Sequence, residues 1–238
     1  MSSPAASRPD AGVVLVAAGA GARAGPGEPK QFRPILGVPM LLRALRPFIS
    51  HPDVLQVAVV LPAAHARQPP EWLARLVGER LTLTPGGAER AQSVRAGLEA
   101  LQRDANVVLV HDAARPFVSR STIDAVLGRA RAGVAAVAAV PVSDTVKSVD
   151  DEHRVQRTVS RDGLWRAQTP QGFPRAMLET AYAAAPAAFA AGTAPTDDAE
   201  LCERYGFPVE VIPDGAHNFK VTTSEDFRIA EALARELW

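Results

Sequence analysis

The sequence contains very little cysteine: Cys202 is the only one in 238 residues. A single cysteine cannot form a disulfide within the chain, which excludes the disulfide-stapled secreted domains and favours a reducing, cytoplasmic location. We interpret Cys202 as a small residue on a helix face and not as a nucleophile. Long apolar runs are missing too. None approaches the roughly 20 residues that a membrane span needs, so we expect no membrane partner.

An excess of charge is also absent, because 26 Lys and Arg residues are matched by 26 Asp and Glu residues. Nucleic-acid-binding proteins usually carry a broad basic surface, so this balance argues against nucleic acid and restricts any phosphate affinity to a local site. The opening MSSPAASRPD lacks a basic segment followed by an apolar run, so we predict a flexible tail at residues 1–11 and no secretory signal. Residues 12–238 are long enough for one large α/β domain.

The most informative stretch runs from Val13 to Gln31, reading VVLVAAGAGARAGPGEPKQ. A short apolar run predicts a buried strand, and a glycine-rich loop with Gly19 and Gly21 follows it directly. Glycines let the backbone approach a ligand closely, and free N–H groups at such a strand end can form an anion-binding concavity. Arg23 and Lys30 add positive charge to this loop. For the glycines alone, a solvent-exposed turn is the alternative interpretation.

Two common phosphate-binding motifs do not fit this loop. Gly19, Gly21 and Ala24 match G-x-G-x-x-A, but the Pro-Gly-Glu-Pro that follows disfavours the helix that a dinucleotide site needs there. The acidic residue that such a site would have about 20 positions on is absent as well. Lys30 is followed by Gln31 and not by Ser or Thr, which excludes a P-loop. A basic loop that wraps a nucleoside triphosphate remains.

The rest of the chain alternates strand and helix patterns, which predicts a single Rossmann-like, doubly wound, mostly parallel α/β sheet. An interior kink or stop is expected near Pro47, and Ser119 is expected to cap a helix. The predicted strands after the first cover residues 56–61, 81–84, 106–110, 135–140 and 209–212, and the predicted helices cover 39–49, 70–78, 119–131, 174–185, 197–205, a segment after residue 89 and the C-terminus.

A second glycine pair, Gly86-Gly87, precedes a predicted helix whose first turn carries Arg90 and Ser93. These two side chains lie one helical turn apart and can point the same way. A strand end that meets a helix N-terminus suits an anion or a base edge. A glycine turn before a solvated helix start is the alternative.

The apolar strand NVVLV delivers His111-Asp112-Ala113-Ala114-Arg115-Pro116 at its carboxyl end, where open α/β sheets bind their ligands. Asp112 is a hard oxygen ligand suited to Mg²⁺ that bridges phosphates. The alternative is a cap of the following turn. His111 is expected to pack or to form hydrogen bonds locally and not to react.

Residues 141–162 alternate β-branched and polar residues around an Asp-Asp-Glu-His turn, which predicts a protruding β-hairpin arm. An isolated hairpin is only marginally stable, so the arm should pack against a second subunit or, alternatively, against its own domain. Just after it, Trp165 is expected to be a packing anchor. The acidic residues of Thr196-Asp197-Asp198-Ala199-Glu200 are expected to cap a helix and not to bind metal.

Five motifs together resemble the sugar-phosphate nucleotidyltransferases, and in particular the cytidylyltransferases that act on 2-C-methyl-D-erythritol 4-phosphate. The motifs are A-A-G-x-G-x-R with P-K-Q, G-G-x-x-R-x-x-S-V, H-D-A-A-R-P, L-W-x-x-Q-T-P-Q-x-F and N-x-K-V-T-x-x-E-D. The string H-D-A-A-R-P favours this group over the relatives that act on ribitol 5-phosphate. Ala22 departs from the family, in which many members have a second basic residue there.

The resemblance implies CTP and a polyol phosphate as substrates, Mg²⁺ or another divalent cation as cofactor, and a homodimer formed through the arm. It implies catalytic roles for Arg23, Lys30, Arg161 and Lys220, nucleotide binding by Ala17, Ala18, Gly19, Gly21, Gly87, Arg90, Ser93 and Ala113, and substrate binding by Asp112, Arg115, Thr145 and Thr169, with Asp112 also holding the metal. A ribitol-5-phosphate cytidylyltransferase, a dehydrogenase and a non-catalytic nucleotide-binding protein are the alternatives.

Overall fold

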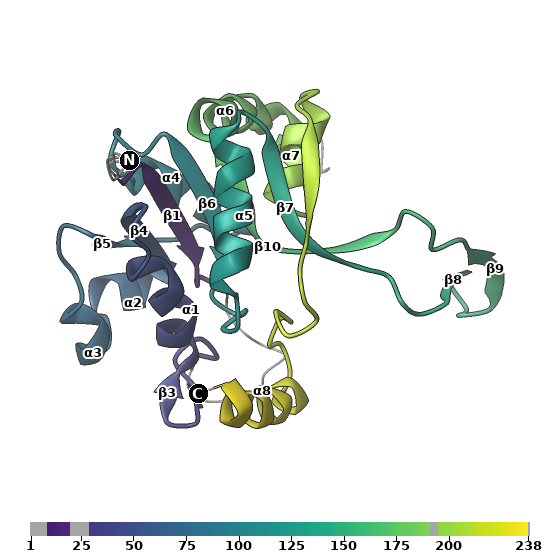
Figure 1. Cartoon of the computed structure of the whole chain (residues 1–238), viewed down its shortest axis with the longest axis horizontal. Coiled ribbons are helices and arrows are strands. Elements are labelled where there is room, and N and C mark those ends of the chain that lie inside the picture. Colours follow the sequence, from purple (N-terminus) through teal and green to yellow (C-terminus); the bar gives the residue numbers. More distant parts are fainter. Residues whose placement is uncertain (1–8, 20–28, 191–194, 238) are drawn as a thin grey trace, which may run out of the picture.

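A seven-stranded sheet forms the centre of the molecule (Figure 1). The computed structural model describes residues 9–19, 29–190 and 195–237. The strand order is β11-β7-β10-β6-β1-β4-β5, and all strands are parallel except β10, which is antiparallel to both of its neighbours. The strands are β1 (Ala11–Val16), β4 (Val54–Leu61), β5 (Leu81–Pro85), β6 (Val107–Asp112), β7 (Ala135–Pro141), β10 (Trp165–Pro174) and β11 (Val209–Pro213).

Helices cover both faces of the sheet, as the alternating pattern predicted. Val13 and Leu15 of β1 pack into one core with α1 (Met40–Ile49) and α5 (Arg120–Arg131). Val14 points to the other face, in a core with α4 (Arg90–Ala100), α6 (Arg175–Ala190) and α7 (Asp198–Arg204). Because β1 is buried on both faces, its sequence reads as a continuous apolar run. None of the described helices is long and apolar enough to cross a bilayer.

The helix α1 ends at Ile49, two residues after Pro47, so it stops near the residue where a kink or stop was expected. One helix prediction needs correction. The helix expected at residues 70–78 is the short α3 (Glu71–Ala74), and α2 (Ala63–Arg67) precedes it. The predicted helix is shorter than expected because the chain turns before residue 78, where Gly78 pairs with Leu81, the first residue of β5.

A third, smaller core fastens the C-terminal helix α8 (Ser224–Leu237) beneath the sheet's carboxyl end. Phe227 and Ala230 pack there with Ile35, which ends the short strand β2 (Pro34–Ile35), and with Met40, which follows the short strand β3 (Val38–Pro39). Val221 belongs to the same cluster, and its N–H donates to the Ala114 carbonyl at 2.8 Å. This core therefore fixes the segment just before α8 beside the loop that follows β6.

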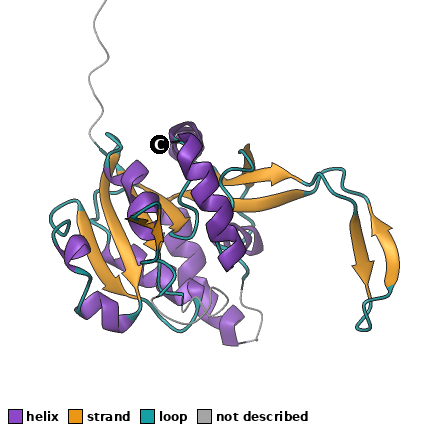
Figure 2. Ribbon diagram, turned by 90° about the horizontal axis from the view of Figure 1, so that it is seen from below, coloured by secondary structure: helices purple, strands orange, loops and turns teal. Residues whose placement is uncertain are grey.

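The segment between β7 and β10 leaves the body as a two-stranded arm made of β8 (Val146–Val149) and β9 (Val155–Val159), which projects to one side (Figures 1 and 2). At its tip the Asp150 carboxylate accepts hydrogen bonds from the N–H groups of Glu152 and Arg154. The structure thus contains a hairpin within the range where the alternating pattern predicted one.

Trp165 is not buried within this chain, contrary to the expectation of a packing anchor. Its exposed fraction is 40%, because β10 begins at the root of the arm, where it pairs with the end of β7. Val149, Val155 and Leu164, also on the arm or its root, are exposed by 39–61%. The arm thus presents an apolar surface to its surroundings.

Candidate active site

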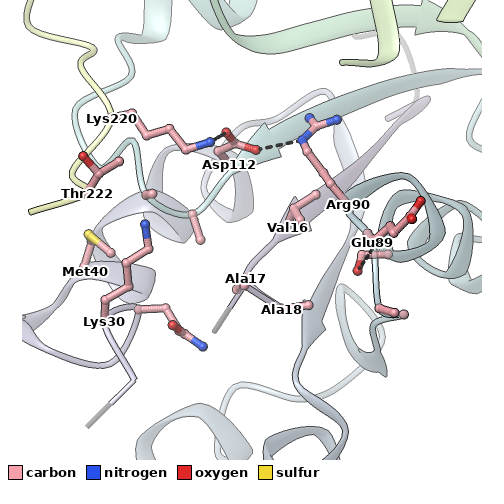
Figure 3. A pocket seen from close by; sticks show the side chains of 17 residues that line it. Val16, Ala17, Ala18, Lys30, Met40, Glu89, Arg90, Asp112, Lys220 and Thr222 are labelled. Atoms are coloured by element: carbon pink, nitrogen blue, oxygen red, sulfur yellow. Dashed lines mark hydrogen bonds and ion pairs between the residues drawn. The ribbon is translucent and has the colours of Figure 1, made fainter. Parts of the chain in front are cut away.

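A cavity of about 400 Å³ opens where β1 and β6 end and α4 begins (Figure 3). Ligands bind at this end of open α/β sheets. Six separate stretches of sequence contribute to it. The lining residues are Val16, Ala17, Ala18, Gly19, Lys30, Gln31, Met40, Gly87, Ala88, Glu89, Arg90, Ser93, Asp112, Ala113, Ala114, Lys220 and Thr222.

The wall beside α4 depends on a close approach between Gly86 and Ala18. A Cβ atom placed on Gly86 would lie 2.4 Å from the Ala18 Cβ and 2.7 Å from the Ser93 Oγ, so only glycine fits. The sequence singled out Gly87, which does line the cavity. The Gln92 side chain closes the turn, because its Oε1 accepts from the N–H groups of Ala88 and Glu89. The N–H groups of Ala88 and Glu89 therefore already have a hydrogen-bond partner within the protein.

A row of alternating charges crosses the cavity from Lys220 through Asp112 to Arg90 (Figure 3). The Lys220 Nζ lies 2.7 Å from the Asp112 Oδ2, and the Arg90 Nε lies 3.4 Å from the Asp112 Oδ1. Burial alone would raise the pKa of Asp112, but the charges of Arg90 and Lys220 outweigh it and hold that pKa well below its usual value. Asp112 is therefore an ionised carboxylate between two cations.

Buried side chains support Asp112 from behind. The Thr169 Oγ1 accepts from the Asp112 N–H at 3.1 Å and lies 2.9 Å from the His111 Nδ1. The His111 Nε2 lies 3.0 Å from the Arg115 carbonyl. These contacts fit a neutral imidazole that donates from Nε2 and accepts from Thr169 at Nδ1. His111 packs locally, as expected, and burial is the main cause that lowers its pKa to about 4.

The His111 pKa predicts a pH-dependent stability. The folded-state pKa of about 4 lies below the ordinary value of 6.5, so the unfolded chain binds the proton more readily. This contribution to stability is fully present above pH 6.5 and is lost as the pH falls towards 4. We expect the free energy of unfolding to drop by about 2 kcal/mol between pH 7.5 and pH 5. Urea titration with a chelator present measures it.

The matched variant for this measurement is His111→Gln, which removes the titrating ring. The variant should unfold with a free energy that changes much less over the same pH interval. An equal slope in both proteins would assign the pH dependence to other groups.

The segment that carries Lys220 is tied to the loop after β6. The Arg115 Nη1 donates to the Asn218 carbonyl at 2.8 Å, and the Asn218 Nδ2 donates to the Thr169 carbonyl at 2.8 Å. Burial is the main cause that lowers the pKa of Arg115. Arg115 and Thr169, predicted to contact substrate, lie behind the cavity wall in this structure and fix the residues that line it.

Lysine is rare in this chain, and most of its lysines lie at the cavity. The sequence has three lysines, and two of them, Lys30 and Lys220, line the cavity. The Lys30 Nζ donates to the Val221 carbonyl at 3.1 Å, so it reaches across to the segment that carries Lys220. The cavity therefore concentrates positive charge in a chain whose formal net charge is zero.

The structure brings together most of the residues that the sequence selected. Ala17, Ala18, Gly19, Lys30, Gly87, Arg90, Ser93, Asp112, Ala113 and Lys220 all line the cavity. Thr145 and Arg161 are exposed at the root of the arm and do not line it, and the Arg161 Nη1 donates to the Ser143 carbonyl. Gly21 and Arg23 lie outside the described residues.

Sequence reasoning missed two kinds of residue. Gln31 and Thr222 line the cavity and belong to the P-K-Q and N-x-K-V-T-x-x-E-D motifs, which was the available signal for them, whereas Met40 lies outside all five motifs. Asp198 lies 2.7 Å from the Arg90 Nη1 although 108 residues separate them. The sequence suggested a helix cap for this acidic pair, and only Asp197 has that role, because its side chain accepts from the Glu200 N–H.

The side chains available as metal ligands determine how the cavity can hold a divalent cation. Among the described residues, no three His, Cys, Asp or Glu side chains gather into a metal-binding cluster. Asp112 and Glu89 are the carboxylates that line the cavity, and Asp112 lies opposite Lys30. A single carboxylate such as that of Asp112 fits Mg²⁺ that takes its other ligands from substrate phosphates and water, which is its usual arrangement in nucleotide sites.

The comparisons with known proteins agree along almost the whole chain. The model of a family described as 2-C-methyl-D-erythritol 4-phosphate cytidylyltransferase matches residues 11–236. A protein of that name from Saccharopolyspora erythraea is 44% identical over 228 residues, which are 93% of this chain and 98% of that protein. One from Frankia casuarinae is 43% identical over 226 residues, covering 94% of this chain and 81% of that protein.

A solved structure is similar as well. The crystal structure of 2-C-methyl-D-erythritol 4-phosphate cytidylyltransferase from Thermus thermophilus superposes with a TM-score of 0.76 at 38% identity. The match covers 93% of this chain and 98% of that one.

Proposed function

The chain belongs to the 2-C-methyl-D-erythritol 4-phosphate cytidylyltransferase family, and we propose that it transfers CMP from CTP to 2-C-methyl-D-erythritol 4-phosphate and releases pyrophosphate. The product is 4-diphosphocytidyl-2-C-methyl-D-erythritol, a precursor in non-mevalonate isoprenoid biosynthesis. One observation carries this proposal: residues from four distant motifs converge on one cavity, where Lys220 and Arg90 contact the carboxylate of Asp112 and Lys30 adds a further ammonium group to the lining.

The reaction needs no nucleophile from the protein. A phosphate oxygen of the acceptor attacks the α-phosphorus of CTP and forms a new P–O bond. The bond from that phosphorus to the oxygen bridging to the β-phosphate breaks, and pyrophosphate leaves. The acceptor oxygen is already anionic near neutral pH, so catalysis requires alignment of two polyanions and neutralisation of their charge.

The cavity residues fit these tasks. Lys30 and Lys220 offer ammonium groups to phosphate oxygens on two sides of the cavity. Ala17, Ala18 and Gly87 bring backbone close to the nucleotide without side-chain bulk, and Ser93 and Arg90 are placed for the base and ribose. Arg23 is assigned to the triphosphate by sequence alone.

Asp112 is the residue proposed to hold the divalent cation. When bound, the cation supplies positive charge to phosphate oxygens and orients the triphosphate. Lys220 and Arg90 contact the same carboxylate, so they keep it ionised and in place.

The arm is proposed to dimerise and to contribute to a partner's site. Its support is the exposed apolar surface at Val149, Val155, Leu164 and Trp165, together with the position of Thr145 and Arg161 outside the cavity of their own chain. In a homodimer, Arg161 and Thr145 would reach the acceptor phosphate of the neighbouring subunit.

Arg161→Ala tests this assignment. We expect the KM for the acceptor to rise by about 10-fold or more, with CTP affinity unchanged, because the lost guanidinium contacts the acceptor phosphate only. Steady-state kinetics with each substrate varied, and calorimetric titration with CTP, measure the two effects.

Subunit mixing distinguishes a shared site from a site within one chain. Arg161→Ala protein mixed with Lys30→Ala protein should regain part of the activity, because each hybrid dimer contains one complete site. Absence of rescue after demonstrated subunit exchange would place Arg161 and Lys30 in the same chain's site.

Pyrophosphate release with CTP and Mg²⁺ tests the function as a whole. Turnover with 2-C-methyl-D-erythritol 4-phosphate and much slower turnover with ribitol 5-phosphate are expected. Faster reaction with the ribitol ester would favour the ribitol-5-phosphate alternative. CTP binding without pyrophosphate release would indicate a non-catalytic nucleotide-binding protein.

A further inference from the structure

Arg90 lies between two carboxylates, and only one of them faces the cavity. Its Nε is 3.4 Å from the Asp112 Oδ1, whereas its Nη1 is 2.7 Å from the Asp198 Oδ2. Asp112 lines the cavity, but Asp198 does not, and the side chain of Asp198 is only 1% exposed. The shorter of the two contacts therefore lies on the side of Arg90 that faces away from the cavity, toward the core that contains α4, α6 and α7.

Asp198 is itself held firmly. The Tyr182 hydroxyl donates to the Asp198 Oδ1 at 2.5 Å, and the Asp198 N–H donates to the Gln171 Oε1 at 3.1 Å. Burial is the main cause that raises the pKa of Tyr182, and the charge of Asp198 adds to it, so the phenol keeps its proton as a donor. Each carboxylate oxygen of Asp198 thus has a defined partner from a different element.

This arrangement assigns a task to each carboxylate. A largely buried guanidinium is costly unless it is paired. If Asp112 were the only partner of Arg90, it would have to compensate Arg90 and Lys220 together. Asp198 takes the shorter contact with Arg90, which leaves the Asp112 charge to Lys220 and to a cation on the nucleotide.

We propose that Asp198, fastened by Tyr182, is a positioning residue that holds Arg90 in the orientation that binds CTP. This inference rests on the proposed function, because it assigns Arg90 to the nucleotide. Asp198 touches no substrate and acts only through Arg90. Its place outside the cavity-lining motifs explains why sequence reasoning did not select it.

Asp198→Asn is the direct test, since it keeps the shape of the side chain and removes its charge. We expect the KM for CTP to rise about 10-fold, with the acceptor KM unchanged and kcat within about 3-fold of wild type, as for lost ground-state binding. Tyr182→Phe should also raise the KM for CTP, by about 2-fold to 3-fold. Calorimetric titration with CTP should show matching losses of affinity.

Asp197→Asn is the matched control. Asp197 caps α7 by accepting from the Glu200 N–H at 2.8 Å, and it accepts from the Gln171 Nε2 at 2.9 Å, but Arg90 donates to its neighbour Asp198. This variant should lower the melting temperature and leave the CTP KM unchanged. A similar rise in CTP KM for both variants would overturn the inference, because it would reflect general loosening of α7.

A double-mutant cycle completes the test. In an Arg90→Ala background, Asp198→Asn should produce no further rise in CTP KM, because its effect passes through the missing guanidinium. Additive effects would overturn the inference. If Asp198→Asn does not fold, Tyr182→Phe in the same two backgrounds gives the answer. Failure of the wild-type protein to release pyrophosphate would instead overturn the proposed function.

Discussion

Replacing Lys30 by alanine is expected to lower turnover by about 10²-fold or more. Lys30 lines the cavity and reaches the Val221 carbonyl, so its ammonium group lies where the triphosphate is proposed to bind. Charge develops on the phosphate oxygens in the transition state, and a fixed donor at such a position contributes that much in other enzymes. Stability should change by about 1 kcal/mol, because the side chain is partly exposed and its ammonium group donates a hydrogen bond to a carbonyl.

Pyrophosphate release under saturating CTP and acceptor measures the effect. Lys147→Ala is the matched control, because it removes the same side chain from the arm, where its Nζ donates to the Thr158 hydroxyl outside the cavity. Its turnover should stay close to wild type. Equal turnover in both variants and wild type would remove Lys30 from the catalytic machinery.

Asp112→Asn is expected to have a second large effect, on turnover and on stability together. The substitution leaves Arg90 and Lys220 without the carboxylate that both contact, and it removes the oxygen ligand proposed for Mg²⁺. Turnover should fall by about 10²-fold or more, and the Mg²⁺ concentration that gives half-maximal rate should rise. Because Asp112 is mostly buried, the free energy of unfolding should drop by roughly 3 kcal/mol.

Rates measured over a Mg²⁺ titration and urea unfolding check the two effects separately. Asp151→Asn, on the exposed turn of the arm, is the control and should leave both quantities unchanged. An Asp112→Asn protein whose Mg²⁺ requirement equals that of wild type would exclude Asp112 as the metal ligand, whatever happens to its stability.

The central strands were predictable because each is buried on both faces. Such strands carry apolar residues on both faces over most of their length, so β1, β4 and β6 stand out as short apolar runs in the sequence. Residues at their carboxyl ends, such as Asp112, could then be placed in the cavity from topology alone. Gly87 and Arg90 followed from the same rule, because they lie where β5 leads into α4.

Other features depend on tertiary contacts that no local pattern contains. The strand β10 has the polar sequence WRAQTPQGFP, and it is a strand because β6 and β7 lie on either side of it. The sequence selected Thr169 for substrate binding, and only the fold shows that its hydroxyl is used by His111 and Asp112. Asp198 belongs to the same class, because its partner Arg90 is remote in sequence.

The scarcity of lysine makes this cavity unusually easy to observe. Reductive methylation with ¹³C-formaldehyde labels side-chain amines, and this chain has three of them, two in the cavity. The NMR spectrum of the labelled protein should therefore contain few resonances, with Lys147 on the arm as an internal reference. Chemical shifts of the other two would report nucleotide occupancy directly, without a coupled assay or a fluorescent analogue.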